Sequence, residues 1–190
     1  MKRAAFLDRD GVINKRASEG EYITRWEDVQ ILPGVADAIA MLNRAGFLVI
    51  VVSNQRCVAK GQISVAQLEE LHERLRHSLA ADGATIDHVY YCPHEKTPPC
   101  SCRKPAPGML LTAAAEHEID LVHSWMVGDS DADVAAGKSV GCKTVLLPEN
   151  APHGNNYSDL VASSLMDAVV RLLETEKSLA TFAPQVSDRK

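Results

Sequence analysis

Three aspartates stand at positions from which their side chains can meet in one site. Asp8 and Asp10 follow the apolar run Ala4–Leu7, and Asp129 follows another apolar run that ends at Gly128. In an extended segment residues two apart point the same way, so Asp8 and Asp10 can face the same pocket. Three carboxylates at close range repel one another unless a cation lies among them. Carboxylate oxygens are ligands that Mg²⁺ prefers, so we predict a Mg²⁺ site here.

A hydroxyl and two basic side chains complete this chemistry. Ser53 ends an apolar run that begins at Leu48, and Arg103 and Lys104 follow a cysteine-rich segment. The Ser53 hydroxyl and the backbone amides after it can donate hydrogen bonds to an anion, and the two cations can neutralise it. With carboxylates and a hard cation, this set suits phosphoryl transfer, which depends on positioning and charge stabilisation. One carboxylate would attack phosphorus and form an aspartyl-phosphate, while its neighbour protonates the leaving oxygen and then activates water.

The cysteine-rich segment contains a second set of metal-binding residue types. Its members are Cys92, His94, Cys100 and Cys102. Three thiolates and one imidazole suit a closed tetrahedral zinc site, which is structural because no position is left for water. We therefore predict a structural Zn²⁺ that pins this loop and positions the two cations that follow it. The alternatives are reduced thiols without a metal and a redox-active thiol set.

Length and charge exclude several classes of protein. The chain has 190 residues, of which 46% are hydrophobic and 24% charged, so it can bury one sizeable core. Its net charge of -5 argues against a general nucleic-acid binder. No apolar run is long enough for a membrane span or a secretory signal, which predicts a cytoplasmic protein without a membrane partner. We expect a monomer with one domain over residues 1–176 and a flexible tail over residues 177–190.

The elements that must position these residues can be read from the hydrophobic pattern. Short apolar runs alternate with longer helical periods, which predicts an α/β fold with a doubly wound, Rossmann-like parallel sheet. The predicted strands cover residues 4–7, 48–53, 88–91, 125–128 and 144–147, with a short sixth at 160–162. The predicted helices cover residues 35–45, 64–81, 108–116, 131–139 and 165–176. Such sheets bind ligands outside the carboxyl ends of their strands, where the polar residues described above are expected.

Four motifs, in this order, resemble those of the haloacid dehalogenase (HAD) superfamily of aspartate-nucleophile phosphatases. They are Asp8-x-Asp10-Gly11-Val12, Ser53-Asn54-Gln55, Lys104 and Gly128-Asp129-x-x-x-Asp133. The resemblance covers residues 1–175 and implies that Asp8 is the nucleophile and Asp10 the general acid and base. It also implies that Ser53 and Lys104 bind phosphate. The implied Mg²⁺ ligands are the Asp8 and Asp129 carboxylates and the Asp10 carbonyl, with Asp133 as a partner of the metal or of Lys104.

The cysteine loop narrows the resemblance to two groups of this superfamily. Cys-x-His with Cys-x-Cys-Arg-Lys-Pro is similar to the heptose bisphosphate phosphatases and to the histidinol-phosphate phosphatases. Residues 8–14 and 103–109 are closer to the heptose group, which implies removal of the C7 phosphate of a heptose 1,7-bisphosphate during synthesis of lipopolysaccharide or another surface glycan. Histidinol phosphate remains the alternative substrate, and the anomer stays open. The intervals between motifs leave no room for a cap domain, so we expect loops to frame the pocket.

Further substrate contacts are expected from Asn54, Arg56 and Arg103, in addition to Lys104. Heptose phosphatases usually carry a small Ser-Gly pair after the second motif, where this chain has Arg56-Cys57. Arg56 would either bind a second phosphate group of the substrate or form a salt bridge across the pocket.

Other polar and aromatic residues have ordinary structural interpretations. His72 and His77 lie five apart on a predicted helix, off the spacing of a shared site, which favours packing or surface roles. Arg9 is expected to face solvent rather than to contact the substrate. Trp26 is as well suited to a pocket wall as to the edge of the core.

Two functions of another class fit this sequence less well than a phosphatase does. A phosphorelay receiver also combines an aspartate, Mg²⁺, a hydroxyl and a lysine, but its phosphorylated aspartate follows the third strand, where this chain has the cysteine loop. A non-catalytic zinc-binding module would have little reason to keep carboxylates that repel one another.

Overall fold

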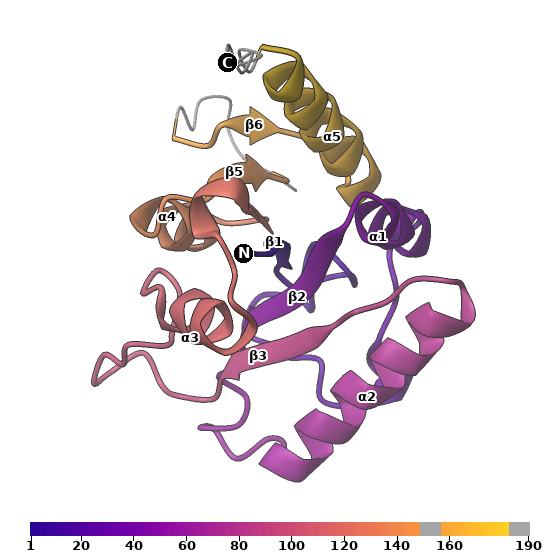
Figure 1. The fold of residues 1–190 in the computed structure, drawn as a ribbon. Coiled ribbons are helices and arrows are strands. Elements are labelled where there is room, and N and C mark those ends of the chain that lie inside the picture. The colour runs from indigo at the N-terminus through magenta and orange to yellow at the C-terminus, as the bar shows by residue number, and fades with distance from the viewer. Residues whose placement is uncertain (149–156, 183–190) are drawn as a thin grey trace, which may run out of the picture.

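Six parallel strands form the centre of the molecule, in the order β3-β2-β1-β4-β5-β6 (Figure 1). The computed structural model describes residues 1–148 and 157–182. The strands are β1 (Arg3–Leu7), β2 (Phe47–Asn54), β3 (His88–Cys92), β4 (Trp125–Gly128), β5 (Lys143–Leu146) and β6 (Leu160–Val161). The predicted α/β class with a doubly wound parallel sheet is therefore confirmed.

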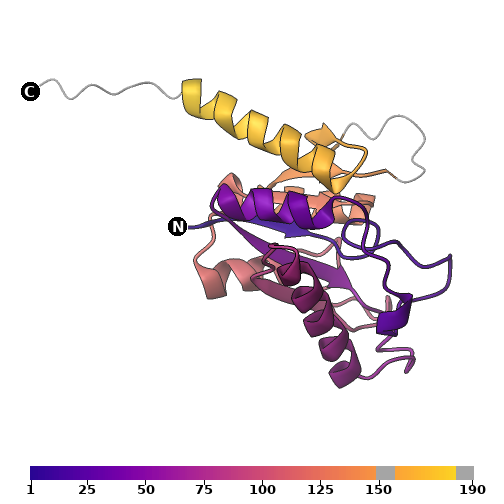
Figure 2. The ribbon, with the colours of Figure 1, turned by 90° about the vertical axis from the view of Figure 1, so that its right-hand side faces the viewer.

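Helices cover both faces of the sheet. They are α1 (Val35–Arg44), α2 (Val65–Ala81), α3 (Gly108–His117), α4 (Asp131–Ser139) and α5 (Leu165–Phe182), with 3₁₀ turns η1 (Trp26–Asp28) and η2 (Leu121–His123). Figure 2 shows α5, α1 and α2 next to one another on one face, and Figure 1 shows α3 and α4 on the other. Because both faces are covered, β1 buries Ala4 and Phe6 on one side and Ala5 and Leu7 on the other.

The start of α2 follows from its sequence. The Ser64 hydroxyl accepts a hydrogen bond from the Gln67 backbone at 3.2 Å, and the Gln67 side chain accepts one from the Ser64 backbone at 3.0 Å. This capping box satisfies amides that the first turn leaves without partners. One face of the helix carries apolar side chains, of which Leu68, Leu71, Leu75 and Leu79 are buried, whereas Val65 in the first turn is 46% exposed.

Most predicted boundaries agree with the structure to within a residue or two, but α5 is longer than expected. The helix continues to Phe182, six residues beyond the predicted end at Glu176. The remaining tail residues, 183–190, lie outside the described residues. No helix in the part of the chain that the structure describes is long and apolar enough to span a membrane.

Between β1 and α1, between β2 and α2, and between β3 and α3 the chain forms only loops and the η1 turn, so no cap domain is present there. Trp26 packs against the core, with the Arg74 guanidinium 5.4 Å from the centre of its ring. The core-edge interpretation of this tryptophan therefore holds, and loops frame the pocket as predicted.

Glu176 ties α5 to the amino ends of three strands. Its carboxylate accepts hydrogen bonds from Arg3 at 3.0 Å, from the Trp125 indole at 3.0 Å and from Lys143 at 2.8 Å. Burial favours the neutral acid, but hydrogen bonds from Lys143 and Trp125 and the nearby cations outweigh it and lower the pKa of Glu176. This stabilisation is present above the ordinary glutamate pKa and is lost as the pH falls through the lowered value.

Replacing Glu176 by Gln is expected to lower the free energy of unfolding by about 1 kcal/mol at pH 7 after allowance for solvent screening. The loss should be smaller at pH 4, because the wild-type carboxylate is then partly protonated in the unfolded chain. Urea denaturation at both pH values measures the difference. Glu174→Gln, at an exposed position on the same helix, is the matched control. An equal loss at both pH values would contradict the electrostatic explanation.

Candidate active site

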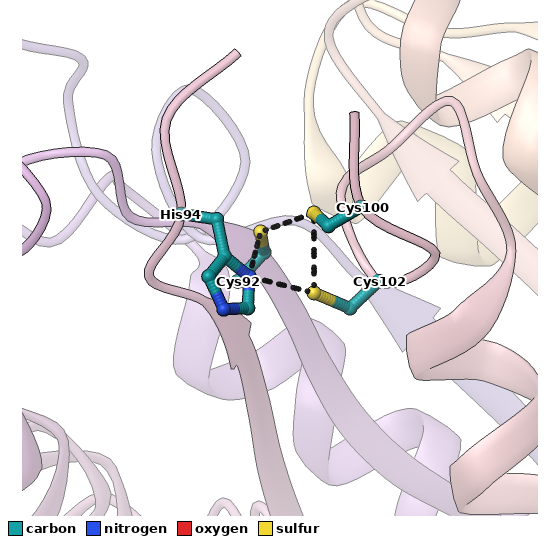
Figure 3. A group of neighbouring side chains, drawn as sticks. All are labelled: Cys92, His94, Cys100 and Cys102. Atoms are coloured by element: carbon teal, nitrogen blue, oxygen red, sulfur yellow. Dashed lines mark hydrogen bonds between the residues drawn. The ribbon is translucent and has the colours of Figure 1, made fainter. Parts of the chain in front are cut away.

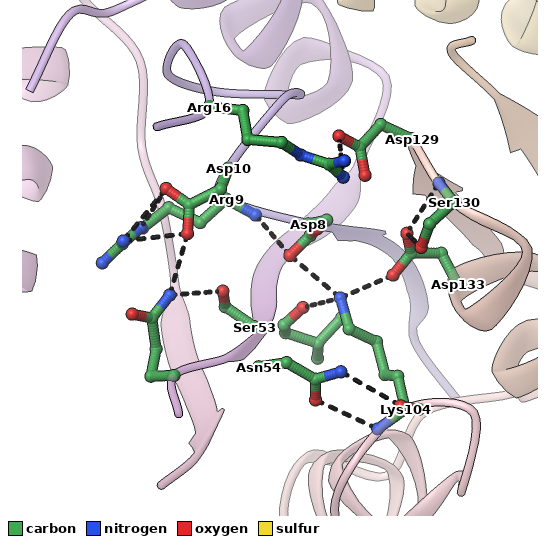
Figure 4. A network of polar contacts seen from close by, with 12 residues as sticks. Asp8, Arg9, Asp10, Arg16, Ser53, Asn54, Lys104, Asp129, Ser130 and Asp133 are labelled. Atoms are coloured by element: carbon green, nitrogen blue, oxygen red, sulfur yellow. Dashed lines mark hydrogen bonds and ion pairs between the residues drawn. The ribbon is translucent and has the colours of Figure 1, made fainter. Parts of the chain in front are cut away.

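Three carboxylates converge at the carboxyl edge of the sheet. Asp8 follows β1, Asp129 follows β4, and Asp133 lies in the first turn of α4. Oxygen atoms from all three lie within 4.8 Å of one another (Figure 4). The sequence-based prediction that Asp8 and Asp129 meet is therefore confirmed, and Asp133 joins them.

Asp129 approaches the backbone of the first motif so closely that only glycine fits opposite it. Gly11 has a φ of +90°, and a Cβ atom there would lie 1.8 Å from Asp129 Oδ2. The Asp129 side chain is 1% exposed, and neither carboxylate oxygen accepts a hydrogen bond from the described residues. Its ion pair is with Arg16, a loop residue that half faces solvent.

The electrostatics of this cluster fit a hard divalent cation. Burial, followed by the charge of Asp8, raises the pKa of Asp129 to about 7. Burial also raises the pKa of Asp8 to about 6, against the opposing effect of Lys104. Buried carboxylates with raised pKa values favour positive charge nearby, and the Asp129 oxygens accept no hydrogen bond from the described residues that would take its place. Oxygen donors of this kind are those that Mg²⁺ takes in proteins.

Lys104 is the buried cation of the site. Its ammonium lies 2.9 Å from Asp8 Oδ1 and 2.6 Å from Asp133 Oδ1, and it donates a hydrogen bond to the Val52 carbonyl at 2.6 Å. The charges of Asp8 and Asp133 outweigh burial and raise the pKa of Lys104. Asn54 fixes the Lys104 backbone, since its side chain donates to the Lys104 carbonyl at 3.0 Å and accepts from the Lys104 amide at 3.1 Å.

Asp10 is held by several donors at once. The Arg9 guanidinium contacts both of its carboxylate oxygens, at 3.0 and 2.9 Å from Nη2. Asn14 donates to Oδ1 at 2.9 Å, and Gln55 donates to Oδ2 at 3.0 Å. Burial opposes ionisation of this carboxyl, but Arg9 and these hydrogen bonds outweigh it and lower the pKa of Asp10. On its far side Arg9 contacts His72 on α2, with 3.2 Å between Nη1 and Nε2.

A cavity of about 210 Å³ opens above these residues. Asp8, Asp10, Ser53 and Lys104 all line it, together with the loop residues Arg16, Ala17, Glu21, Tyr22 and Ile23. Those same five loop residues border a neighbouring cavity of about 730 Å³. The buried Ser53 hydroxyl accepts a hydrogen bond from Gln55 at 2.8 Å. The four residues predicted to do the chemistry therefore face one space large enough for a phosphate group, with room beside it for the rest of a small molecule.

The four predicted ligands of the cysteine loop form a compact cluster in which their side chains point toward one another (Figure 3). Cys92 Sγ lies 3.6 Å from His94 Nδ1 and from Cys100 Sγ, and Cys102 Sγ lies 3.2 Å from His94 Nδ1 and 3.5 Å from Cys100 Sγ. These separations are too long for disulfides, whose sulfur atoms are about 2.05 Å apart. A tetrahedron with metal–sulfur bonds of about 2.3 Å has sulfur–sulfur edges near 3.8 Å, so the cluster fits zinc.

The structure places the remaining residues that were predicted to contact the substrate at different positions. Arg56 pairs with Glu95 at 2.5 Å and is not among the residues that line the 210 Å³ cavity, which matches its salt-bridge alternative. Arg103 donates to the His94 carbonyl at 3.4 Å and borders a separate cavity of about 500 Å³, together with Asn54 and Lys104. Asn54 also lines the 210 Å³ cavity, although its amide group is used on the Lys104 backbone.

Sequence reasoning missed four residues of this site. They are Arg9, Arg16, Gln55 and His72. Arg9 was expected to be solvated, yet its side chain is 1% exposed because it pairs with Asp10. His72 has the packing role that the sequence favours, and it also contacts the Arg9 side chain. Its position one turn after Leu68 and one turn before Leu75 is the signal that places it on the buried face of α2.

The chain is similar to known proteins over most of its length. A model of HAD-hydrolase-like proteins matches residues 101–168. The D-glycero-beta-D-manno-heptose-1,7-bisphosphate 7-phosphatase of Pseudomonas putida is 45% identical over 141 residues, which are 74% of this chain and 79% of that protein. The enzyme of the same name from Escherichia coli K12 is 37% identical over 185 residues, which are 92% of this chain and 95% of that protein.

A solved structure shows the same fold. The D,D-heptose 1,7-bisphosphate phosphatase from B. bronchiseptica, crystallised with magnesium and phosphate, is 30% identical to this chain, with a TM-score of 0.82. The match covers 91% of this chain and 99% of that one.

Proposed function

This chain belongs to the HAD-like family of D-glycero-D-manno-heptose-1,7-bisphosphate 7-phosphatases, and from that membership we propose that it hydrolyses the C7 phosphate of this sugar bisphosphate. The observation that carries the proposal is the convergence of Asp8, Asp10 and Lys104 on one phosphate-sized cavity beside an acidic cluster. The resemblance places this reaction in the supply of heptose for lipopolysaccharide or a related surface glycan.

In the first step Asp8 attacks the phosphorus atom. A bond forms between an Asp8 carboxylate oxygen and phosphorus, and the bond from phosphorus to the C7 oxygen breaks. Arg9 and its hydrogen bonds lower the pKa of Asp10, but the negative charge of the bound phosphate ester opposes its ionisation, so Asp10 takes up a proton on substrate binding and gives it to the C7 oxygen. Asp8 is oriented for this attack because its Oδ1 accepts hydrogen bonds from Lys104 at 2.9 Å and from the Arg9 amide at 2.8 Å.

In the second step water hydrolyses the aspartyl-phosphate. Asp10, now ionised, takes a proton from the water, whose oxygen bonds to phosphorus as the bond to Asp8 breaks, and inorganic phosphate is released. Arg9, Asn14 and Gln55 hold the Asp10 carboxylate in place for both proton transfers.

Lys104 and Ser53 bind the phosphoryl group in this proposal. Lys104 carries positive charge into a buried site, where it counts for more than it would in water. The Asp8 and Asp129 carboxylates and the Asp10 carbonyl would hold Mg²⁺, which supplies further positive charge to the phosphoryl oxygens.

The decisive experiment measures kcat/KM side by side on both anomers of the heptose bisphosphate, on histidinol phosphate and on a hexose 6-phosphate. We expect one anomer of the heptose bisphosphate to exceed histidinol phosphate by at least about 100-fold, a difference of about 3 kcal/mol in transition-state stabilisation. A preference for histidinol phosphate would replace the proposed substrate, and turnover of none of the phosphate esters would overturn the phosphatase assignment.

We further propose that Cys92, His94, Cys100 and Cys102 hold a structural Zn²⁺. Replacing Cys100 by Ser is then expected to remove the zinc and to raise the KM about 10-fold, because the loop that leads to Arg103 and Lys104 loosens. Zinc content by atomic absorption and steady-state kinetics measure the two effects. Cys142→Ala, at a buried thiol outside the cluster, is the control. Loss of zinc with an unchanged KM would contradict the positioning role.

A further inference from the structure

Arg9 is one of the largest fully buried side chains of the molecule, although it carries a positive charge. A buried guanidinium is tolerated when its donors find acceptors and its charge is paired. On one edge, Nε and Nη2 donate to the Asp10 carboxylate at distances between 2.9 and 3.2 Å. The charge of Arg9 is therefore paired by the residue that acts as acid and base in the proposed function.

The other edge of the guanidinium faces α2. Nη1 lies 3.2 Å from Nε2 of His72, a residue 63 positions away in sequence whose side chain is 4% exposed. Burial and the charge of Arg9 lower the pKa of His72 to about 3, so the imidazole is neutral at physiological pH. A neutral imidazole with its proton on Nδ1 presents a lone pair at Nε2 and can accept the Arg9 hydrogen bond.

His72 is itself held firmly. Its ring packs against Tyr91 of β3, with 5.5 Å between ring centres and 54° between ring planes. The Tyr91 hydroxyl in turn donates to Glu69 on α2 at 3.0 Å. The acceptor for Arg9 is thus fixed between a strand and a helix, and a rigid acceptor holds a long side chain in one rotamer.

We propose that His72 is a positioning residue, which fixes the Arg9 guanidinium and through it the Asp10 carboxylate relative to Asp8. This inference rests on the proposed function, because it assigns proton transfer to Asp10. Its physical basis is that general acid catalysis requires the acid within hydrogen-bond reach of the leaving oxygen, and small displacements are costly.

A comparison of two substrates tests this role. A sugar phosphate has a poor alkoxide leaving group and needs the proton from Asp10, whereas p-nitrophenyl phosphate releases a stable phenolate without it. His72→Leu is expected to lower kcat/KM for the heptose bisphosphate about 10- to 100-fold and that for p-nitrophenyl phosphate less than about 3-fold. His72→Gln, which keeps an acceptor for Arg9, should restore most of the sugar phosphate activity. A loss merely due to disturbed packing would affect both substrates alike.

The outcomes separate this inference from the proposed function. Asp10→Asn should show the same selective loss on the sugar phosphate, and equal losses on both substrates would overturn the acid role of Asp10 itself. With that role intact, a His72→Leu enzyme that loses both activities equally, or neither, overturns the positioning role. If His72→Leu does not fold, His72→Met, which fills similar space without a strong acceptor, gives the same two-substrate comparison.

Discussion

Replacing Asp8 by Asn is expected to reduce kcat by about 10⁴-fold or more, because the amide cannot form the aspartyl-phosphate. The fold should survive. Asn keeps the shape of the side chain and an oxygen that can accept from Lys104 and the Arg9 amide. It also removes a carboxylate whose pKa burial raises to about 6, so the loss of its charge relieves repulsion from Asp133 and Asp10.

Steady-state kinetics and thermal unfolding of the same Asp8→Asn preparation measure both parts of this prediction. Asp82→Asn, at the exposed C-cap of α2, makes the same change of charge outside the site and should leave kcat unchanged. Turnover within about 10-fold of the wild type would rule out Asp8 as the nucleophile. If the variant does not fold, mass spectrometry of the wild-type enzyme stopped during turnover tests the assignment instead. It should find the phosphoryl group on Asp8.

Replacing Lys104 by Met is expected to affect stability as well as activity. Its ammonium lies between Asp8 and Asp133, and its removal leaves two buried carboxylates without their common cation. Loss of one partner from a buried ion pair typically costs about 3–5 kcal/mol of unfolding free energy. Loss of a buried charge that stabilises the transition state is expected to lower kcat about 10²- to 10³-fold.

A double-mutant cycle distinguishes this explanation from lost packing. In an Asp8→Asn background one of the two carboxylates is already neutral, so Lys104→Met should cost less stability there, by about 1–3 kcal/mol. Urea denaturation of the four proteins gives the coupling. Additive losses would show that the ion pair between Asp8 and Lys104 does not account for the lost stability.

The residues of the site that could be predicted are those whose positions are determined by the ends of strands. Asp8, Ser53 and Asp129 each follow an apolar run, and parallel strands bring such positions to one edge whatever the details of packing. The cysteine cluster was predictable for another reason, since its ligand types and spacing specify a site without reference to the fold.

The rest of the site could not be predicted, because it depends on the directions of side chains, which no local sequence pattern determines. Asp10 was expected to face the pocket, and it does, but the sequence does not show that Arg9 folds back onto it or that His72 arrives from α2. The pairing of Arg16 with Asp129 depends on the path of a loop without periodicity. The same is true of Arg56, whose partner Glu95 comes from another loop.

The parallel arrangement of the sheet gives its two edges different constraints. The carboxyl edge holds the buried charges of Asp8, Lys104 and Asp129, whereas the amino edge is tied together by Glu176. Substitutions around Glu176 should therefore alter stability additively with changes at the site, because the two groups share no partners. A library that varies the amino edge could raise the thermal tolerance of this enzyme while its chemistry stays constant, which is a practical route to robust variants for synthesis of heptose derivatives.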